Sequence, residues 1–332
     1  MERVKRMAKI SVLGSGGWGL ALALTVFANG YDVTVWSPFE EEVKELKEKR
    51  TNARLLNGVI IPEKINITND INDIKGSIIT VLATPSFAIR ETAKRLKDLE
   101  NFGVLVNVAK GLEKDSLKRL SQVIEEELPK APLVVLSGPS HAEDVARKIP
   151  TMLTAASTDA ECSALVQKVF SNDFLRVYTN PDIIGVELGG ALKNVIAVAA
   201  GLCDGMGLGD NSKAALITRG LAEMVRLGEK MGAEHTTFSG LTGLGDLIVT
   251  CTSQHSRNNR FGNLVGKGVS VQDALNQVGT VEGYYAAKMA HELSLKYGAS
   301  TPIIDMCYEL LYNNKPTKDI VKELMSRPFK EE

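Results

Sequence analysis

The chain has 332 residues, 44% of them hydrophobic and 24% charged, so it is long enough for two domains and too apolar to be disordered. Its 39 lysines and arginines nearly balance 40 aspartates and glutamates, and a formal net charge of −1 disfavours nucleic acid or a membrane surface as the main partner. The four cysteines are widely spaced with no C-x-x-C pair, and the histidines are scattered. This pattern argues against a metal site or a disulfide framework and fits a reducing cytoplasm.

The N-terminus imitates a secretory signal, because Arg3, Lys5, Arg6 and Lys9 precede an apolar stretch. Glycines interrupt that stretch from Gly14 onward, and no convincing small-residue cleavage site follows them. We therefore expect no targeting segment.

A glycine-rich turn follows the first predicted strand. Residues 9–13 are β-branched and apolar, the letters G-S-G-G-W-G occupy residues 14–19, and an apolar helix is expected through Ala28. Between a strand and a helix, the pattern G-x-G-x-x-G permits a tight turn and a close approach of the backbone to a pyrophosphate, which the helix N-terminus then holds. A glycine-rich turn without a ligand is the alternative.

The second predicted strand, residues 31–36, is followed by a charged helix over residues 40–50. After this strand an NAD-preferring fold usually offers an acid to the ribose hydroxyls, and an NADP-preferring fold offers basic groups. The sequence has Ser37, Pro38 and Phe39 there, so neither signature is present. Glu40 or Arg50 could reach the ribose only through the geometry of the loop.

Strands and helices continue to alternate up to residue 180. Further strands are predicted at residues 78–83, 104–109, 133–137, 151–156 and 174–178, with helices at 86–96 and 117–128. This alternation predicts a largely parallel, doubly wound sheet, in which ligands bind beyond the carboxyl ends of the strands. Lys110 stands at such an end, where it is a candidate to hold an anionic or carbonyl oxygen, and a solvated surface lysine is the alternative.

An apolar helix is predicted over residues 181–203, with Asn180 as its N-cap and Pro181 at its first position. It is apolar on nearly every face and must be buried, yet Lys193 and Asn194 lie in its middle. A buried lysine needs a partner or loses its charge. Either it is structural, reaching the surface or pairing with a carboxylate such as Glu187, or it acts as an acid or base.

Long helical periods punctuated by glycine follow, which predicts a separate helical domain. The turn at residues 240–246 delivers Asp246, which either pairs with Lys193 or caps a helix. Ser256, Arg257 and Asn258 precede another helix, where a guanidinium and nearby N–H groups suit a phosphate, and a solvated basic loop is the alternative.

Taken together, these segments resemble the NAD(P)-dependent glycerol-3-phosphate dehydrogenases of the bacterial type, over nearly the whole chain. The strings that carry the resemblance are G-S-G-G-W-G at residues 14–19, N-V-A-K-G-L-E at 107–113, G-P-S-H-A-E at 138–143, E-L-G-G-A-L-K-N-V at 187–195, G-L-G-D-N-S-K-A-A-L-I-T-R-G at 207–220, L-T-G-L-G-D-L at 241–247, S-R-N-N-R-F-G at 256–262 and V-E-G at 281–283.

The resemblance implies a reversible hydride transfer between sn-glycerol 3-phosphate and NAD or NADP, giving dihydroxyacetone phosphate and serving glycerophospholipid synthesis. Lys193 matches the family's proton acceptor, Asp246 orients it and Lys110 stabilises the oxyanion. The implied substrate-binding residues are Lys110, Gly138, Ser140, Lys193, Asn194, Asp246, Ser256, Arg257 and Asn258. The implied cofactor-binding residues are Gly14, Ser15, Gly16, Gly17, Trp18, Gly19, Pro38, Lys110, Ala142, Arg257, Thr280 and Glu282.

Two of these positions depart from the family pattern. Many relatives carry a basic residue where Pro38 stands, which bears on preference for a 2′-phosphate. Gly17 replaces a small hydroxyl residue, so one side-chain contact to the pyrophosphate is expected to be lost.

The fold class we expect is α/β plus all-α, with a Rossmann-like domain at residues 1–180 and a helical substrate-binding and catalytic domain at residues 181–332. We expect a cytoplasmic homodimer that acts on a small phosphorylated substrate, with no metal, no nucleic acid and no membrane span. Two alternatives are a related two-domain hydroxyacid or ketopantoate-type reductase and a dinucleotide-sensing protein without turnover.

Overall fold

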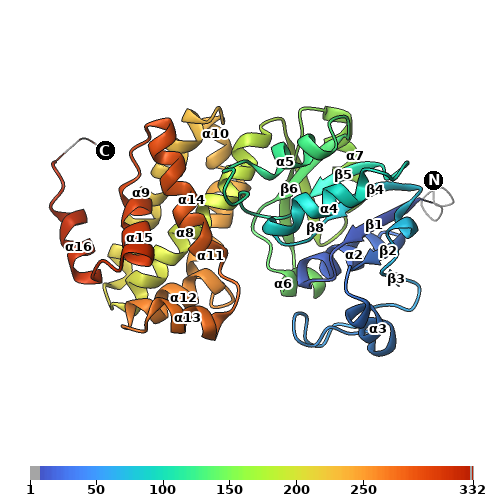
Figure 1. Ribbon diagram of the computed structural model, residues 1–332, viewed down its shortest axis with the longest axis horizontal. Coiled ribbons are helices and arrows are strands. Elements are labelled where there is room, and N and C mark those ends of the chain that lie inside the picture. The colour runs from blue at the N-terminus through green and yellow to red at the C-terminus, as the bar shows by residue number, and fades with distance from the viewer. Residues whose placement is uncertain (1–7, 330, 332) are drawn as a thin grey trace. The chain divides into compact units, whose positions relative to one another are not determined.

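The computed structural model describes residues 8–329 and residue 331, so Arg3, Lys5 and Arg6 of the signal-like segment lie outside the described residues. The chain forms two compact units, Met1–Glu187 and Leu188–Glu332. The division falls near the start of helix α8 (Ile183–Gly205), which is coloured yellow-green in Figure 1.

The first unit contains an eight-stranded sheet in the order β3-β2-β1-β4-β5-β6-β7-β8. Neighbouring strands are parallel except β6 and β7, which are antiparallel. The strands are β1 (Lys9–Leu13), β2 (Asp32–Trp36), β3 (Asn66–Thr68), β4 (Ser77–Leu82), β5 (Val104–Asn107), β6 (Leu133–Ser137), β7 (Thr151–Ala156) and β8 (Leu175–Asn180). The helices are α2 (Gly17–Ala28), α3 (Glu40–Lys49), η1 (Ile71–Ile74), η2 (Ser86–Ala88), α4 (Ile89–Leu96), α5 (Leu120–Glu127), α6 (Ala142–Ala146) and α7 (Ala160–Phe170).

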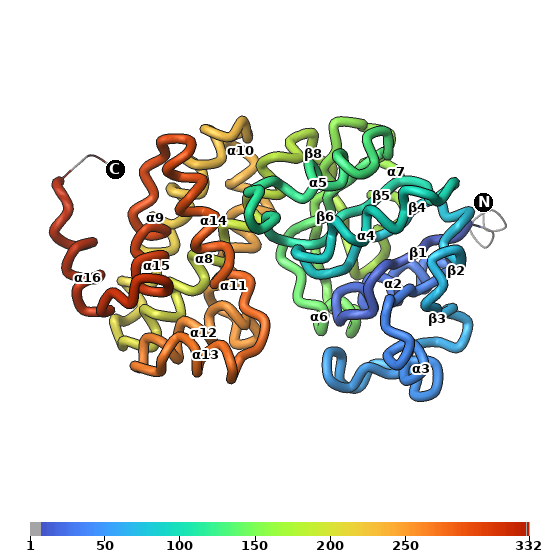
Figure 2. Tube along the Cα trace, viewed as in Figure 1, coloured from blue at the N-terminus to red at the C-terminus, as the bar shows by residue number. Residues whose placement is uncertain are grey.

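Helices cover both faces of this sheet (Figures 1 and 2). Val12 packs in one apolar cluster with residues of α2, α3 and α7, and the next residue, Leu13, packs in a second cluster with residues of α4 and α5. Successive side chains of a strand point to opposite faces, so strands buried on both sides are apolar at nearly every position. The predicted doubly wound sheet is confirmed.

In the first unit the structure adds four elements that the sequence analysis did not predict, namely β3, η1, α6 and α7. Strand β3 has only three residues and lies at the edge of the sheet, where a short apolar pattern gives little signal. Helix α7 carried a signal that could have been used, since Asp159 caps it by accepting from the backbone N–H groups of Glu161 and Cys162.

Every regular element among the described residues of the second unit is a helix, and loops connect these helices (Figure 2). After α8 it contains α9 (Gly209–Lys230), α10 (His235–Phe238), the π-helix η3 (Leu241–Gly245), α11 (Asp246–Thr252), α12 (Arg257–Gly266), α13 (Val271–Val278), α14 (Glu282–Tyr297), α15 (Pro302–Asn313) and α16 (Thr317–Met325). Among the described residues, α8 alone is long and apolar enough to cross a membrane, and 89% of its most apolar window is buried inside the structure. Burial of this extent fits a core helix.

Helix α8 begins two residues later than predicted. Asn180 is the last residue of β8, paired with Ala156, so its backbone is extended. The cap is Asp182, whose Oδ1 accepts from the N–H of Gly185 at 2.8 Å, while Asn180 Oδ1 accepts from the N–H of Asp182 at 2.8 Å. The prediction of Asn180 as N-cap and Pro181 as first helical residue was therefore wrong, because the sheet extends farther than the sequence indicated.

Candidate active site

The three motif glycines of the glycine-rich turn have different structural roles. Gly14 has φ +120°, donates its N–H to Trp36 O at 2.8 Å, and leaves no room for a Cβ, which would lie 2.6 Å from Ala83 O. A Cβ on Gly19 would lie 2.1 Å from Gly14 O. A Cβ on Gly16 would meet no heavy atom within 4 Å. Two glycines therefore permit the turn and its packing, and the third faces open space.

The open space adjoins the N-terminus of α2. Gly16 occupies the N-cap without a side-chain hydrogen bond, and the first turn of the helix contains no acidic residue. Free N–H groups and the helix dipole therefore suit an anion there. These features fit the pyrophosphate of a dinucleotide cofactor, which Gly14, Ser15, Gly16, Gly17, Trp18 and Gly19 would hold.

Two further candidate cofactor residues of this unit lie at separate places. Ala142 begins α6, and its Cβ would be 3.7 Å from a Cβ added to Gly17. That added atom would also be 3.3 Å from Leu55 O, so a hydroxyl residue at position 17 would be crowded by the loop before β3. Pro38 is exposed and follows β2 and Ser37.

Lys110, Gly138 and Ser140 come together beyond the carboxyl ends of β5 and β6. The Nζ of Lys110 donates to Gly138 O at 2.8 Å, and the Oγ of Ser140 donates to the same oxygen at 2.9 Å. Lys110 is half-buried rather than a fully solvated lysine. This is the end of the sheet where parallel α/β folds bind ligands.

Lys193 lies in a buried polar group with Asp246 and Thr250. Its Nζ donates to Asp246 Oδ1 at 2.7 Å and to Thr250 Oγ1 at 2.7 Å, and Thr250 Oγ1 donates to Asp246 O at 2.6 Å. The exposed fractions of Lys193, Asp246 and Thr250 are 5%, 1% and 5%. Burial at this depth makes the ion pair a strong constraint on the position of the ammonium, because either charge alone would be costly.

Glu187 is not the partner of Lys193. Its carboxylate accepts from Arg119 Nη1 at 2.6 Å, from Ser121 Oγ at 2.6 Å and from the Ser121 N–H at 2.7 Å. Burial raises the pKa of Glu187, and Arg119 opposes that shift. The suggestion that Lys193 pairs with Glu187 was wrong, because Glu187 accepts its hydrogen bonds from residues at the N-terminus of α5.

Asp246 is the first residue of α11, and Gly245 rather than Asp246 occupies the cap position. The Asp246 side chain contacts Lys193 of α8, because the π-helix that precedes Asp246 packs closely on α8. A Cβ on Gly189 would lie 2.6 Å from Thr242 O, and a Cβ on Gly243 would lie 2.1 Å from Phe238 O. Gly189 thus permits the π-helix to approach α8, which brings Asp246 to Lys193, and Gly243 permits the π-helix to pack on α10.

The sequence analysis missed Thr250. The signal was available, because Thr250 follows Asp246 by four residues and such pairs lie on one face of a helix. Thr250 accepts a hydrogen bond from the Lys193 ammonium, so it is a second residue, beside Asp246, that fixes the position of that ammonium.

Asn194 and Asn258 bond to each other. Asn258 Nδ2 donates to Asn194 Oδ1 at 2.9 Å, and the Gly283 N–H donates to Asn258 Oδ1 at 2.8 Å. This chain of hydrogen bonds links α8, α12 and the start of α14. Both asparagines are buried, and their bond ties α12 to the residue that follows Lys193 in α8.

The phosphate-binding candidates lie at the start of α12. Ser256 caps this helix by accepting from the Asn259 N–H, and Arg257 is the first helical residue and is exposed. A helix follows Ser256 as predicted, but it begins at Arg257, so Arg257 and Asn258 belong to its first turn instead of preceding it. Thr280 is exposed, and Glu282 is the first residue of α14.

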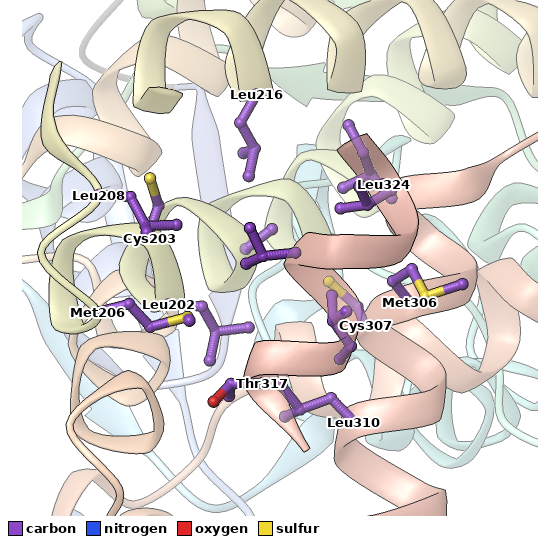
Figure 3. A pocket seen from close by; sticks show the side chains of 14 residues that line it. Leu202, Cys203, Met206, Leu208, Leu216, Met306, Cys307, Leu310, Thr317 and Leu324 are labelled. Carbon is purple, nitrogen blue, oxygen red and sulfur yellow. The ribbon is translucent and has the colours of Figure 1, made fainter. Parts of the chain in front are cut away.

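An apolar cavity of about 60 Å³ lies elsewhere in the second unit, among α8, α9, α15 and α16. Figure 3 shows Leu202, Cys203, Met206 and Leu310 around it. None of its lining residues is charged, and Thr317 brings a hydroxyl. Such a lining does not suit an anionic ligand.

Comparison with known proteins covers both units. Family models for the N-terminus and C-terminus of NAD-dependent glycerol-3-phosphate dehydrogenase match residues 9–163 and 182–322. The glycerol-3-phosphate dehydrogenase [NAD(P)+] of Fusobacterium nucleatum is 51% identical over 329 residues, covering 98% of each chain. That of Bacillus pumilus is 50% identical over 327 residues, covering 97% of this chain and 95% of the relative.

Solved structures give the same result. The crystal structure of glycerol-3-phosphate dehydrogenase from Coxiella burnetii has a TM-score of 0.92 and 37% identity, covering 96% of this chain and 99% of that one. A ketopantoate reductase from Ralstonia eutropha, with a TM-score of 0.60 and 13% identity over 96% of this chain and 99% of that one, shares the fold alone. The chain belongs to the NAD-dependent glycerol-3-phosphate dehydrogenase family.

Proposed function

We propose that the protein interconverts sn-glycerol 3-phosphate and dihydroxyacetone phosphate by hydride transfer with NAD or NADP, and so supplies glycerol 3-phosphate for glycerophospholipids. The observation that carries the proposal is the buried Lys193–Asp246 pair, in a chain about half identical to curated glycerol-3-phosphate dehydrogenases along its whole length. A lysine so placed has the chemistry to exchange a proton with a substrate oxygen.

In this proposal Lys193 gives its proton to the C2 oxygen when the ketone is reduced and takes it back when the alcohol is oxidised. The bound cofactor supplies or accepts the hydride at C2. Asp246 stabilises the ammonium and, with Thr250, fixes its direction. Lys110 stabilises negative charge on the C2 oxygen as it develops.

The second unit would also hold the phosphate. Arg257, exposed at the N-terminus of α12, offers a guanidinium beside the free N–H groups of the first turn. The bond between Asn258 and Asn194 ties that turn to the helix that carries Lys193. Arg257→Ala should therefore raise the KM for dihydroxyacetone phosphate about tenfold or more, since charge-assisted bonds to a phosphate are lost.

The decisive experiment follows the loss of nicotinamide absorbance with dihydroxyacetone phosphate and, separately, with unphosphorylated dihydroxyacetone. The phosphorylated ketone should be reduced far faster. Lys193→Ala should lower kcat at least about a hundredfold, as expected when a general acid is removed. NADH binding, followed by its fluorescence, should persist.

The matched control is Lys288→Ala, which removes an exposed lysine of α14. It should leave turnover unchanged. Full turnover in Lys193→Ala would contradict the proposal, and NADH binding without turnover in the unaltered protein would favour the dinucleotide-sensing alternative.

We also propose that the protein is a homodimer in the cytoplasm, as the family resemblance implies. Light scattering of the purified protein tests the dimer, and fractionation of cells tests the location.

A further inference from the structure

The end of strand β2 lies beside the glycine-rich turn. Trp36 pairs with Leu13 in the sheet, and its carbonyl accepts the N–H of Gly14 at 2.8 Å. Ser37 follows directly, so it stands level with the turn that would hold the pyrophosphate. In folds of this kind the adenosine ribose lies at this strand end, where its 2′ substituent is recognised.

The acid at this position comes from α3 and is held by Ser37. Ser37 is buried, and its Oγ donates to Glu42 Oε2 at 2.5 Å. Glu42 is half-buried. Glu40 and Glu41 precede it in the same first turn. The sequence offered Glu40 as the candidate, whereas the structure brings Glu42 back to the strand end.

The nearby basic residue Arg50 is turned to another segment. Its Nη1 donates to Ile65 O at 2.9 Å, and its Nε lies 3.4 Å from Glu63 Oε2. The loop from Asn52 to Val59 carries one basic residue, Arg54, which is exposed. Arg54 is therefore the one side chain of this loop that could compete for a 2′-phosphate.

Charge decides between the two cofactors. A 2′-hydroxyl can donate a hydrogen bond to a carboxylate, whereas a 2′-phosphate brings about two negative charges to a turn with three glutamates. The N-terminus of α3 contributes only about half a positive charge. We infer that Glu42, held by Ser37, makes this chain select the cofactor with a free 2′-hydroxyl, NADH, over NADPH.

Equilibrium binding tests this inference without turnover. Calorimetric titration at low salt should give a dissociation constant for NADPH about tenfold or more above that for NADH, as expected for repulsion between like unit charges near a protein surface. Glu42→Gln, which keeps the shape and removes the charge, should tighten NADPH binding about tenfold. Pro38→Arg in the same background should tighten it further.

Two controls separate the alternatives. Glu48→Gln removes the same charge about 9 Å farther along α3 and should leave the ratio of the two constants unchanged. Arg54→Ala should also leave it unchanged, whereas a selective loss of NADPH binding would assign the 2′-phosphate to Arg54. Equal or tighter binding of NADPH by the unaltered protein would overturn the inference, as would equal effects of Glu42→Gln and Glu48→Gln.

The inference rests on the proposed dehydrogenase function for its meaning in catalysis. Its test measures binding alone, so the two can fail separately. Preference for NADH without reduction of dihydroxyacetone phosphate would support the inferred cofactor selection and contradict the proposed reaction. Reduction of dihydroxyacetone phosphate with NADPH as readily as with NADH would support the proposed reaction and contradict the inferred cofactor selection.

Discussion

At the glycine-rich turn, an added methyl group should have opposite consequences at two neighbouring positions. Gly16 has φ −64°, which any residue adopts, and its Cβ would point into open space. Gly16→Ala should therefore leave the midpoint of thermal unfolding nearly unchanged. The methyl group would occupy the place proposed for the pyrophosphate, so the dissociation constant for NADH should rise about tenfold or more.

Gly19→Ala is the matched substitution with the reverse expectation. Its Cβ would lie 2.1 Å from Gly14 O, so helix and turn must separate. Overpacking of this kind costs about 1–3 kcal/mol, which a lower midpoint in urea unfolding would show. If Gly16→Ala unfolds as easily as Gly19→Ala, or binds NADH as tightly as the unaltered protein, the assignment of open space at Gly16 to a ligand is wrong.

At the scale of elements, helix α15 is capped by a side chain from another helix. Glu223 of α9 accepts from the Ile303 N–H at 2.8 Å and from the Ile304 N–H at 3.1 Å. It is 1% exposed. Burial raises the pKa of Glu223 from 4.5 to about 7, against the opposing effect of these backbone donors.

This shift predicts a dependence of stability on pH. Because the pKa is higher in the folded state, the folded protein binds the proton more tightly, and the stabilisation present below pH 4.5 is lost as the pH rises to about 7. The loss should be about 3 kcal/mol in the free energy of unfolding. Glu223→Gln should remove this slope, which urea unfolding across the interval would show.

Glu125→Gln is the control for that measurement, since it changes an exposed glutamate of α5. Its curve should run parallel to that of the unaltered protein. A curve for Glu223→Gln that is also parallel would show that Glu223 does not titrate in this interval.

The elements that sequence patterns predicted well are those in which local and tertiary preferences agree. Strands β6 and β7 have the predicted bounds, because both are apolar runs with polar residues at their ends. The predicted start of α8 was wrong because pairing with β7 extends β8 through Asn180, and no local sequence pattern shows that pairing. The partner of Glu187 was missed for the same reason, since Arg119 lies 68 residues away.

For the whole molecule, the sequence indicated two kinds of structure and the side chains that carry chemistry, but not how those side chains are held. A buried lysine implied a carboxylate, and Asp246 was one of two candidates. The π-helix that presents Asp246 depends on Gly189 at its contact with α8 and on Gly243 at its contact with α10, so it could be recognised only from packing. The Asn194–Asn258 bond is likewise a product of packing, whereas Thr250 could have been found from its spacing to Asp246.

The proposed cofactor residues belong to both units, and this can be tested on the whole chain. Hydrogen exchange should slow on addition of NADH in the turn at residues 14–19 and at the amides of Thr280 and Glu282, because bound ligands reduce local opening. The Gly283 amide already donates to Asn258 and should change little. Helices α13 and α16 should be unaffected, and Gly16→Ala should weaken the protection in both segments together. Protection confined to the first unit would remove Thr280 and Glu282 from the proposed cofactor site and would support the glycine-rich turn alone.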